Sequence, residues 1–191
     1  SEEPRSLLMR EVDHRARNAL AVVQSLVKLT TAGDLEAYKD KLLGRISALA
    51  RAQGNLAERK WEGASLHYIV CEELVTLCPR ETFDVKGPDV LLRAEQAQPV
   101  SVVIHELATN AFKHGALSRP AGRVLVEWAW DGPDLVIEWI ETGGPPVRAP
   151  DRHGFGSKLI RQLAQQVGAS FEKDWLETGI RARMRLPLER R

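Results

Sequence analysis

The first sixty residues repeat apolar side chains at the period of an α-helix, in two stretches separated by a turn. In residues 7–30 these side chains fall within roughly 80° of one another around a helical axis. They are Leu8, Val12, Ala16, Ala19, Val23 and Leu26. A second stretch starts after Asp34, a suitable N-cap residue, and carries Leu35, Leu42, Ile46, Leu49 and Leu56. Two such helices joined by a short turn predict an antiparallel hairpin over residues 1–61.

A hairpin of this size has too little core to be stable alone. Packing against a second copy of itself would complete a four-helix bundle with the apolar stripes facing inward. We therefore expect a homodimer formed through the hairpin, because a two-fold interface is the commonest way in which identical chains associate.

From residue 62 onward, helical stretches alternate with short strands. Helices are expected at 66–77, 96–114 and 157–167, the first of them capped by Ser65. Strands are expected at 82–86, 89–93, 123–130, 134–140, 170–175 and 181–186. Turns at Gly87-Pro88 and at 131–133 each predict a hairpin between the flanking strands. This order predicts an α/β sandwich with helices on one face of a mixed sheet, so the whole chain is assigned to the α+β class.

Composition places the chain among folded proteins without a strong net charge. It has 191 residues, of which 43% are hydrophobic and 28% charged, and 27 basic residues nearly balance 26 acidic ones. A net charge of +1 argues against nucleic acid or an anionic membrane surface as a partner. No apolar run reaches the roughly 18 residues of a membrane span, so we expect no membrane segment and a cytoplasmic location.

His14 is the first residue with a candidate chemistry. It lies about 150° around the helix from the centre of the apolar stripe, which predicts an exposed imidazole. Asn18 follows one turn later with Arg17 beside it, and Asp13 is placed to orient the ring or accept its proton. An exposed histidine is most often an ordinary surface residue. An accessible neutral imidazole is nevertheless a competent nucleophile toward phosphorus.

A polar face on the helix expected at 96–114 carries the second candidate chemistry. Glu106, Asn110, Lys113 and His114 follow one another at offsets of four, three and one, which places them along one side of that helix. Carboxylate and amide oxygens suit Mg²⁺ and a cation suits phosphate, so this set matches a magnesium nucleotide. A solvated polar face is the competing interpretation. His105, next to Glu106 but beside alanines, is as suited to packing as to ligand binding.

Glycines in the second half of the chain form a third candidate. Gly143 lies in a Gly/Pro-rich loop, and Gly154 and Gly156 precede a helix expected from Ser157, where small residues let backbone N–H groups approach a phosphate. Glu141, at the end of a strand, could accept a hydrogen bond from the exocyclic amine of a base. Each signal is weak alone, and their order along the chain strengthens them.

Four motifs in sequence order carry a resemblance to a known family. They are Glu11-Val-Asp-His-Arg-Ala-Arg-Asn18, His105-Glu-Leu-Ala-Thr-Asn110 with Lys113-His-Gly-Ala-Leu-Ser118, Trp139-Ile-Glu141 with Gly143-Gly-Pro145, and Gly154-Phe-Gly-Ser157. Together they resemble the HWE family of bacterial sensor histidine kinases, over about residues 7–187. The family is named after the His, Trp and Glu that His105, Trp139 and Glu141 match.

The resemblance implies a dimerisation and histidine-phosphotransfer hairpin over residues 1–61, followed by a GHKL-type (Bergerat) ATP-binding domain over residues 62–191. His14 would be the autophosphorylation site, and its surroundings would be Asp13, Arg17 and Asn18. Asn110 would bind Mg²⁺, with Glu106 as a catalytic residue near the metal. The other ATP-binding residues would be Lys113, His114, Glu141, Gly143, Gly154, Phe155, Gly156 and Ser157.

The activity that the resemblance implies is ATP-dependent autophosphorylation on His14, followed by phosphoryl transfer to an aspartate of a response-regulator receiver domain. ATP and Mg²⁺ are the implied cofactors. Because Ser1 stands where an initiating Met would be, we expect that a sensor domain on its N-terminal side is missing from this sequence. The sequence leaves open whether His14 would be phosphorylated within one chain or across a dimer.

Two other functions stay open. The chain could be a histidine phosphotransfer protein whose ATP-binding domain has become a scaffold, or a GHKL switch protein that binds ATP and a partner or phosphorylates serine. Two positions also depart from the family pattern. Arg17 stands where the phosphoacceptor motif has Lys, which keeps the charge but changes the donor geometry. Ile180 follows Gly179 where many GHKL proteins have Thr, which affects one contact on the adenine side.

Overall fold

The computed structural model describes residues 3–149 and 155–188. Its helices are α1 (Glu3–Leu29), α2 (Leu35–Glu58), α3 (Leu66–Val75), α4 (Ala94–Lys113) and α5 (Phe155–Gln166), with 3₁₀ turns η1 (Arg80–Thr82) and η2 (Ala116–Ser118). Its strands are β1 (Ala64–Ser65), β2 (Phe83–Lys86), β3 (Leu91–Leu92), β4 (Arg123–Asp131), β5 (Asp134–Thr142), β6 (Ser170–Leu176) and β7 (Gly179–Pro187). Two leading helices followed by interleaved helices and strands confirm the predicted α+β class.

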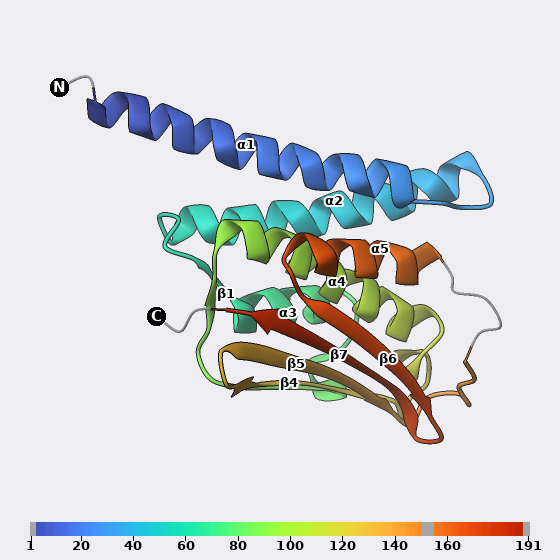
Figure 1. Cartoon of the computed structure of the whole chain (residues 1–191). Helices are drawn as coiled ribbons and strands as arrows, with labels where there is room; N and C mark the ends of the chain where they lie inside the picture. The colour runs from blue at the N-terminus through green and yellow to red at the C-terminus, as the bar shows by residue number, and fades with distance from the viewer. Residues whose placement is uncertain (1–2, 150–154, 189–191) are drawn as a thin grey trace.

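Five of the strands form one mixed sheet, in the order β2-β4-β5-β7-β6. β2 runs parallel to β4, and the other neighbouring pairs of this sheet are antiparallel. Helices α3, α4 and α5 cover one face of the sheet, and the hairpin of α1 and α2 lies over them on the side away from the sheet (Figure 1). The molecule therefore has three layers, with the two-helix hairpin outermost.

The predicted hairpin between residues 82–86 and 89–93 is wrong. β2 pairs instead with β4, and β3 pairs with β1 in a separate two-stranded ladder. The Gly87-Pro88 turn packs on Trp128, whose indole Nε1 donates a hydrogen bond to the Pro88 carbonyl at 2.8 Å. A Cβ atom on Gly87 would lie 2.4 Å from the same ring. With the turn packed on Trp128, the residues that follow it form β3, which pairs with β1 outside the main sheet and not with β2. The hairpin predicted at 131–133 is confirmed by the pairing of β4 with β5.

Both predicted N-caps are present. Asp34 accepts a hydrogen bond from the backbone N–H of Ala37 at 2.8 Å, and the Ser65 hydroxyl accepts one from the N–H of Tyr68 at 3.3 Å. The phenol of Tyr38 also donates to the Val27 carbonyl at 3.0 Å, across the turn between α1 and α2. These contacts hold the two helices as the antiparallel pair that the apolar pattern predicts.

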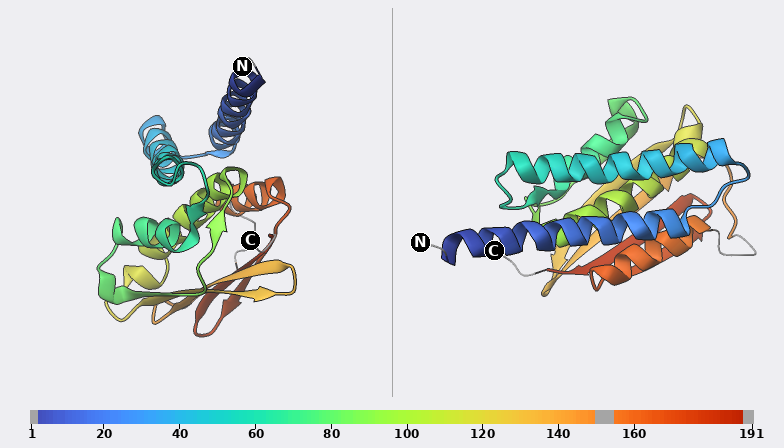
Figure 2. Two further views of the ribbon diagram at one scale, coloured as in Figure 1. Left: turned by 90° about the vertical axis from the view of Figure 1, so that its left-hand side faces the viewer. Right: turned by 90° about the horizontal axis from the view of Figure 1, so that it is seen from above.

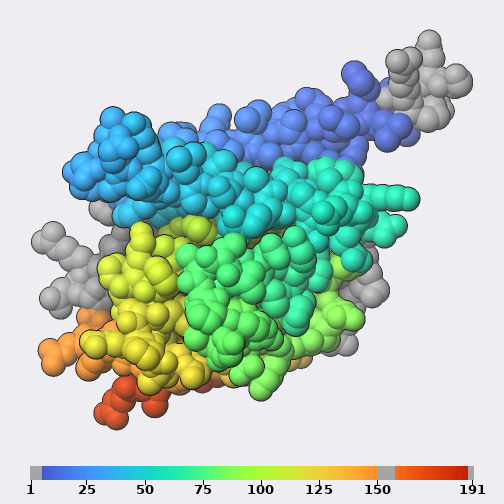
Figure 3. Space-filling model, turned by 180° about the vertical axis from the view of Figure 1, so that it is seen from behind, coloured from blue at the N-terminus to red at the C-terminus, as the bar shows by residue number. Residues whose placement is uncertain are grey.

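Only the second half of α1 rests on the helices beneath it. Leu26 is fully buried, and Gln166 of α5 donates a hydrogen bond to the Ser25 hydroxyl at 3.1 Å. The first turns of α1 extend past the rest of the molecule in the ribbon view (Figure 2), and the blue surface of α1 forms the outer edge of the molecule beyond α2 (Figure 3). Leu8 and Val12 in these turns are 67% and 64% exposed. Even with these exposed apolar residues, no helix within residues 3–149 and 155–188 has the length and apolar character needed to cross a membrane.

α2 packs along α4 and shares its core. Leu49 and Leu56 of α2 are buried in the same continuous cluster as Leu107 of α4 and Trp139 of β5. A boundary between two domains near residue 61 stays a prediction. The packing nevertheless means that α2 bears directly on the helix that carries the predicted nucleotide-binding residues.

Candidate functional site

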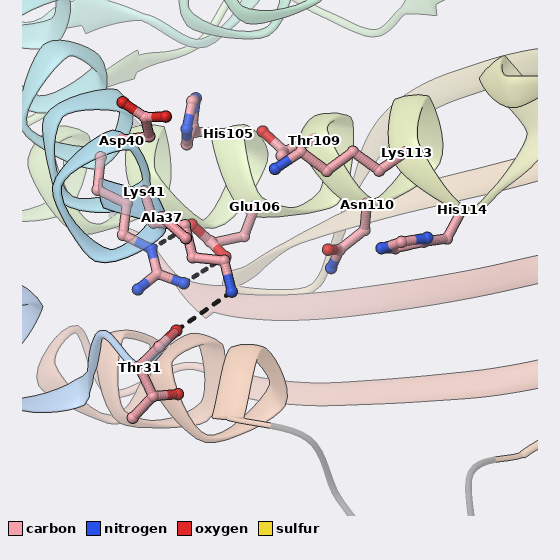
Figure 4. Close-up of a pocket in the computed structure, with 12 residues that line it drawn as sticks. Thr31, Ala37, Asp40, Lys41, His105, Glu106, Thr109, Asn110, Lys113 and His114 are labelled. Atoms are coloured by element: carbon pink, nitrogen blue, oxygen red, sulfur yellow. Dashed lines mark hydrogen bonds and ion pairs between the residues drawn. The ribbon is translucent and has the colours of Figure 1, made fainter. Parts of the chain in front are cut away.

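A cavity of about 530 Å³ lies between α4 and the N-terminal half of α2, beside the turn that joins α1 to α2 (Figure 4). Four of the residues predicted to bind a magnesium nucleotide line it, namely Glu106, Asn110, Lys113 and His114. The hairpin supplies the opposite wall, with Thr31, Ala37, Asp40, Lys41, Gly44 and Arg45. The four predicted residues of α4 thus line one cavity, and the volume of this cavity falls in the range of small-molecule binding sites.

Three of these side chains offer free hydrogen-bonding groups. Asn110 is half-buried, Lys113 and His114 are exposed, and Asn110 and His114 project from the same side of α4 as Glu106 (Figure 4). In the described part of the chain, none of the three side chains forms a hydrogen bond or an ion pair. An amide oxygen, an ammonium group and an imidazole are therefore available to an anionic ligand in the cavity.

Glu106, in contrast, is occupied. Arg45 donates from Nε to Glu106 Oε1 at 2.6 Å and from Nη2 to Oε2 at 2.8 Å. The third guanidinium nitrogen, Nη1, donates to the Thr30 hydroxyl at 2.6 Å. Both charged side chains are more than nine-tenths buried. Their contact is a bidentate, charge-assisted pair in which the fork of the arginine matches the carboxylate.

A second ion pair joins α2 to the body of the protein. Arg51 donates to both oxygens of Glu73 on α3, at 2.9 and 2.8 Å, and His105 Nδ1 lies 2.9 Å from Glu73 Oε2. Glu73 is 1% exposed. The imidazole of His105 also meets α2, because a Cβ on Gly44 would lie 3.1 Å from its Nε2. Of the two interpretations left open for His105, packing is the one that these contacts support.

Glu141 is held by its neighbours at the end of β5. Trp139 Nε1 donates to Oε1 at 3.0 Å, and the Ala116 N–H donates to Oε2 at 3.0 Å. The carboxylate is buried, and the chain around it is close: a Cβ on Gly115 would lie 2.2 Å from Oε2, and one on Gly179 would lie 1.9 Å from the Glu141 carbonyl oxygen. The three residues of the family signature therefore make two separate contacts. Trp139 donates a hydrogen bond to Glu141, and His105 contacts Glu73 instead.

A lysine that the sequence analysis did not single out lies near this carboxylate. Burial lowers the pKa of Lys173 on β6, and the charge of Glu141 acts in the opposite direction. The Lys173 ammonium also lies 5.4 Å from the centroid of the Trp175 ring. A half-buried cation that lies over an aromatic ring is therefore close enough to the predicted base-reading residue to feel its charge.

The glycine-rich segment is described in part. Gly143 has a φ of 72°, and a Cβ there would lie 2.4 Å from the Ala121 carbonyl oxygen, so the position requires glycine. Gly154 lies outside the described residues. Phe155, Gly156 and Ser157 form the first turn of α5, which begins two residues earlier than expected. A helix N-terminus at this place presents backbone N–H groups, as the sequence predicts.

His14 is exposed on α1, as predicted, and does not line the cavity. Asp13 pairs with Arg17 one turn later, and His14 makes no hydrogen bond within the described residues. The imidazole lies ~24 Å along the helix axis from Thr30, at a rise of about 1.5 Å per residue. Next to it, Arg15 stacks over Trp61 at 4.4 Å from the ring centroid, beyond the far end of α2. His14 and the cavity are therefore at opposite ends of the hairpin.

The donor set fits a magnesium nucleotide. Mg²⁺ commonly keeps one or two protein oxygens and takes the rest of its ligands from phosphates and water. The Asn110 amide oxygen meets that need without a carboxylate cluster, and no group of three or more acidic, His or Cys side chains suited to a metal occurs in the described residues. Lys113 and His114 lie within the same cavity for the phosphates.

Comparisons with known proteins point to one family. The model of the family described as HWE histidine kinase matches residues 11–89. Among curated proteins, a blue-light-activated histidine kinase of Rhizobium johnstonii is 34% identical over 94% of this chain and 53% of its own length. Blue-light-activated histidine kinase 1 of Erythrobacter litoralis is 33% identical over 93% of this chain and 52% of its own. The chain thus spans about half the length of these relatives.

Solved structures show the same fold. The blue-light activated histidine kinase EL346 of Erythrobacter litoralis superposes with a TM-score of 0.72 at 24% identity, covering 95% of this chain and 59% of that one. The histidine kinase domain of the same protein gives a TM-score of 0.65 at 17% identity, covering 92% of this chain and 94% of that one. Motifs, fold and relatives coincide over nearly the whole chain, and the chain belongs to the HWE histidine kinase family.

Proposed function

We propose that this chain is the kinase core of an ATP-dependent protein-histidine kinase, which autophosphorylates on His14 and passes the phosphoryl group to an aspartate of a response-regulator receiver domain. The observation that carries the proposal is that Asn110, Lys113 and His114, which have no side-chain partner among the residues that the structure describes, line one cavity. An exposed histidine on α1 supplies the acceptor.

Each residue of the site has a part in binding ATP. Asn110 would hold Mg²⁺ through its amide oxygen, and Lys113 and His114 would donate hydrogen bonds to the phosphates. Glu141 accepts a hydrogen bond from the exocyclic amine of adenine through a lone pair left free by Trp139 and Ala116. When bound, Mg²⁺ neutralises charge on the phosphates. The binding energy goes mainly into positioning, which is the chief requirement of phosphoryl transfer.

The transfer step is a displacement at the γ-phosphorus. A ring nitrogen of His14 forms the new P–N bond as the bond to the oxygen bridging the β- and γ-phosphates breaks, and ADP leaves. The proton lost from the imidazole goes to a carboxylate, for which Glu106 is the candidate. The phosphohistidine then passes the phosphoryl group to a carboxylate of the receiver domain: the P–N bond breaks as the new O–P bond forms, and His14 takes up a proton to become a neutral imidazole again.

A homodimer through the hairpin is part of the proposal. Leu8 and Val12 remain uncovered in a single chain, so a second copy has apolar surface to bury there. Mixing a His14→Gln chain with an Asn110→Ala chain separates the two routes of transfer. Recovered labelling of the mixture requires transfer between chains, and its absence assigns transfer to one chain.

Labelling with γ-³²P ATP and Mg²⁺ tests the activity itself. We expect His14→Gln and Asn110→Ala each to abolish labelling, because one removes the acceptor and the other the metal ligand. His67→Gln, at an exposed histidine of α3, is the matched control and should label like the parent protein. Labelling that persists in His14→Gln would refute the assignment of the acceptor. Titration with Mg-ATP separates the kinase from a phosphotransfer protein with a scaffold domain, since the latter would bind no nucleotide.

A further inference from the structure

Arg45 joins three elements at the edge of the candidate site. It projects from α2, donates from Nε and Nη2 to the two oxygens of Glu106 on α4, and donates from Nη1 to the hydroxyl of Thr30, the residue that follows α1. Thr30 is itself 4% exposed, and its hydroxyl donates to the Leu26 carbonyl at 2.5 Å. One guanidinium group therefore ties the helix that bears His14 to the helix that bears the nucleotide-binding residues.

This contact removes Glu106 from the chemistry proposed for it. Both carboxylate oxygens point into the arginine fork, and the charge of the carboxylate is neutralised at short range. A general base needs a lone pair directed at the proton that it takes, within about 3.2 Å. With Arg45 in place, Glu106 neither faces His14 nor carries a free negative charge. The role given to Glu106 thus requires that Arg45 leave it.

The same contact holds α1 in a position from which His14 does not reach the cavity of its own chain. His14 lies ~24 Å along the α1 axis from Thr30, at about 1.5 Å rise per residue, so α1 must be repositioned, or a second chain must act, before His14 meets the cavity. α1 is otherwise lightly held, because those of its described side chains that are buried lie within residues 22–30, and Arg15 adds only its stacking on Trp61. The described polar contacts of residues 22–31 beyond α1 itself are those of Ser25, Val27, Thr30 and Thr31.

Arg51 provides an internal comparison on the same helix. It too binds a buried carboxylate through two bonds, but its partner is Glu73 on α3. It does not line the cavity and makes no bond to α1 or to Glu106. The two arginines therefore form similar ion pairs, of which only the pair of Arg45 reaches both the His14 helix and the site.

We propose that Arg45 is an autoinhibitory latch, which in the closed arrangement seen here withholds Glu106 and fixes the end of α1, and whose release frees both together. The inference rests on the proposed kinase function. The latch has two arrangements: Arg45 is either bound to Glu106 and Thr30 or released to solvent. Any ligand, partner or modification that favours the released arrangement activates the kinase.

The experiment compares Arg45→Met with Arg51→Met in the full chain, because methionine keeps much of the aliphatic stem and removes the charge. We expect Arg45→Met to raise the initial rate of autophosphorylation about tenfold, a coupling of ordinary allosteric size. Arg51→Met should stay within about twofold of the parent protein, since its ion pair touches neither α1 nor Glu106. An unchanged or lower rate in Arg45→Met, or an equal rise in both variants, would overturn the proposal.

Amide hydrogen exchange tests the proposed latch independently of catalysis. Arg45→Met should speed exchange in residues 22–34 at least several-fold while Arg51→Met leaves this segment unchanged. If no protein incorporates label, the kinase proposal fails, and this exchange result still supports or refutes the latch. If Arg45→Met does not fold, Arg45→Lys replaces it: a single ammonium group cannot reproduce the two-pronged contact, and exchange and rate should move in the same direction. Exchange identical to that of the parent protein would refute the latch.

Discussion

Replacing Trp139 with Phe isolates the indole N–H that holds Glu141, because phenylalanine keeps an aromatic ring but has no donor. The indole donates to Oε1 at 3.0 Å, and both side chains are almost fully buried. A hydrogen bond to a charged group contributes about 1.5–3 kcal/mol. Trimming a buried ring adds about 1 kcal/mol for the space that it leaves. We therefore expect Trp139→Phe to lower the free energy of unfolding by about 2.5–4 kcal/mol.

Trp128→Phe is the matched control. Trp128 lies on the neighbouring strand β4, is 4% exposed, and donates to the neutral carbonyl oxygen of Pro88. The same ring is trimmed, but the bond that is lost has an ordinary value of about 0.5–1.5 kcal/mol. The difference between the two variants should be about 1–1.5 kcal/mol in urea unfolding, with m-values that stay unchanged.

Nucleotide titration adds a functional readout to this pair. A loosened Glu141 is less well directed at adenine, so Trp139→Phe should weaken binding of Mg-ATP about five- to tenfold while Trp128→Phe leaves it unchanged. Two results would refute the reasoning. Equal destabilisation by both substitutions would mean that the charge of Glu141 adds nothing to the bond, and equal affinities would remove Glu141 from the base-binding role.

Two further predictions concern charge and backbone. Burial alone would raise the pKa of Glu138, but the hydrogen bonds from Arg181 and Arg183 outweigh it and hold the pKa below its ordinary value. Such a carboxylate stabilises the fold at pH values above its ordinary pKa, and this contribution is lost as the pH falls through the pKa of the folded state. Glu138→Gln should therefore reduce the loss of stability below about pH 5. Acid unfolding curves that run parallel to those of the parent protein would contradict this. Gly179→Ala should destabilise by at least about 2 kcal/mol, because the position has a φ of 144° and the new Cβ would lie 1.9 Å from a carbonyl oxygen. Gly54→Ala, with open space around it inside α2, should stabilise by about 0.5–1 kcal/mol, and thermal unfolding of both variants checks the pair.

The long helices and the hairpin of β4 and β5 were predictable from local pattern alone. A stripe with a period of 3.6 residues and an N-cap such as Asp34 report on contacts within a few residues, and these contacts formed as expected. The hairpin at Gly87-Pro88 failed for the opposite reason. Its turn residues are ordinary, but their docking site is Trp128, some forty residues further along the chain.

Two charged residues show what the sequence could have revealed about the site. Arg45 lies three residues after Leu42 and four before Leu49, at the centre of an apolar stripe, and Glu73 lies four residues after Ile69 in a similar place. A charge at a core-facing position requires a buried partner. The pattern therefore indicates two buried ion pairs.

The partners themselves lie beyond the reach of local pattern. Glu106 is 61 positions from Arg45, and Glu73 is 22 positions from Arg51, so neither pair leaves a periodic trace. The first pairing depends on how α2 packs on α4, and the second on how α2 packs on α3. The polar face of α4, in contrast, was predicted as a unit, because residues three and four apart on one helix are neighbours whatever packs on them.

The chemistry of the Arg45 contact bears on how it works as a latch. A buried ion pair is a weak source of net stability, because the cost of removing both charges from water offsets most of their attraction, and apolar pairs of similar size often stabilise as well or better. Its strength lies in geometry: the guanidinium fork accepts one carboxylate orientation. When the contact opens toward solvent, water takes over the hydrogen bonds of Arg45 and Glu106. An ion pair at this position thus fixes the geometry of the closed arrangement, while its opening costs little free energy. A pair of leucines would expose apolar surface to water on opening, so its release would cost more free energy.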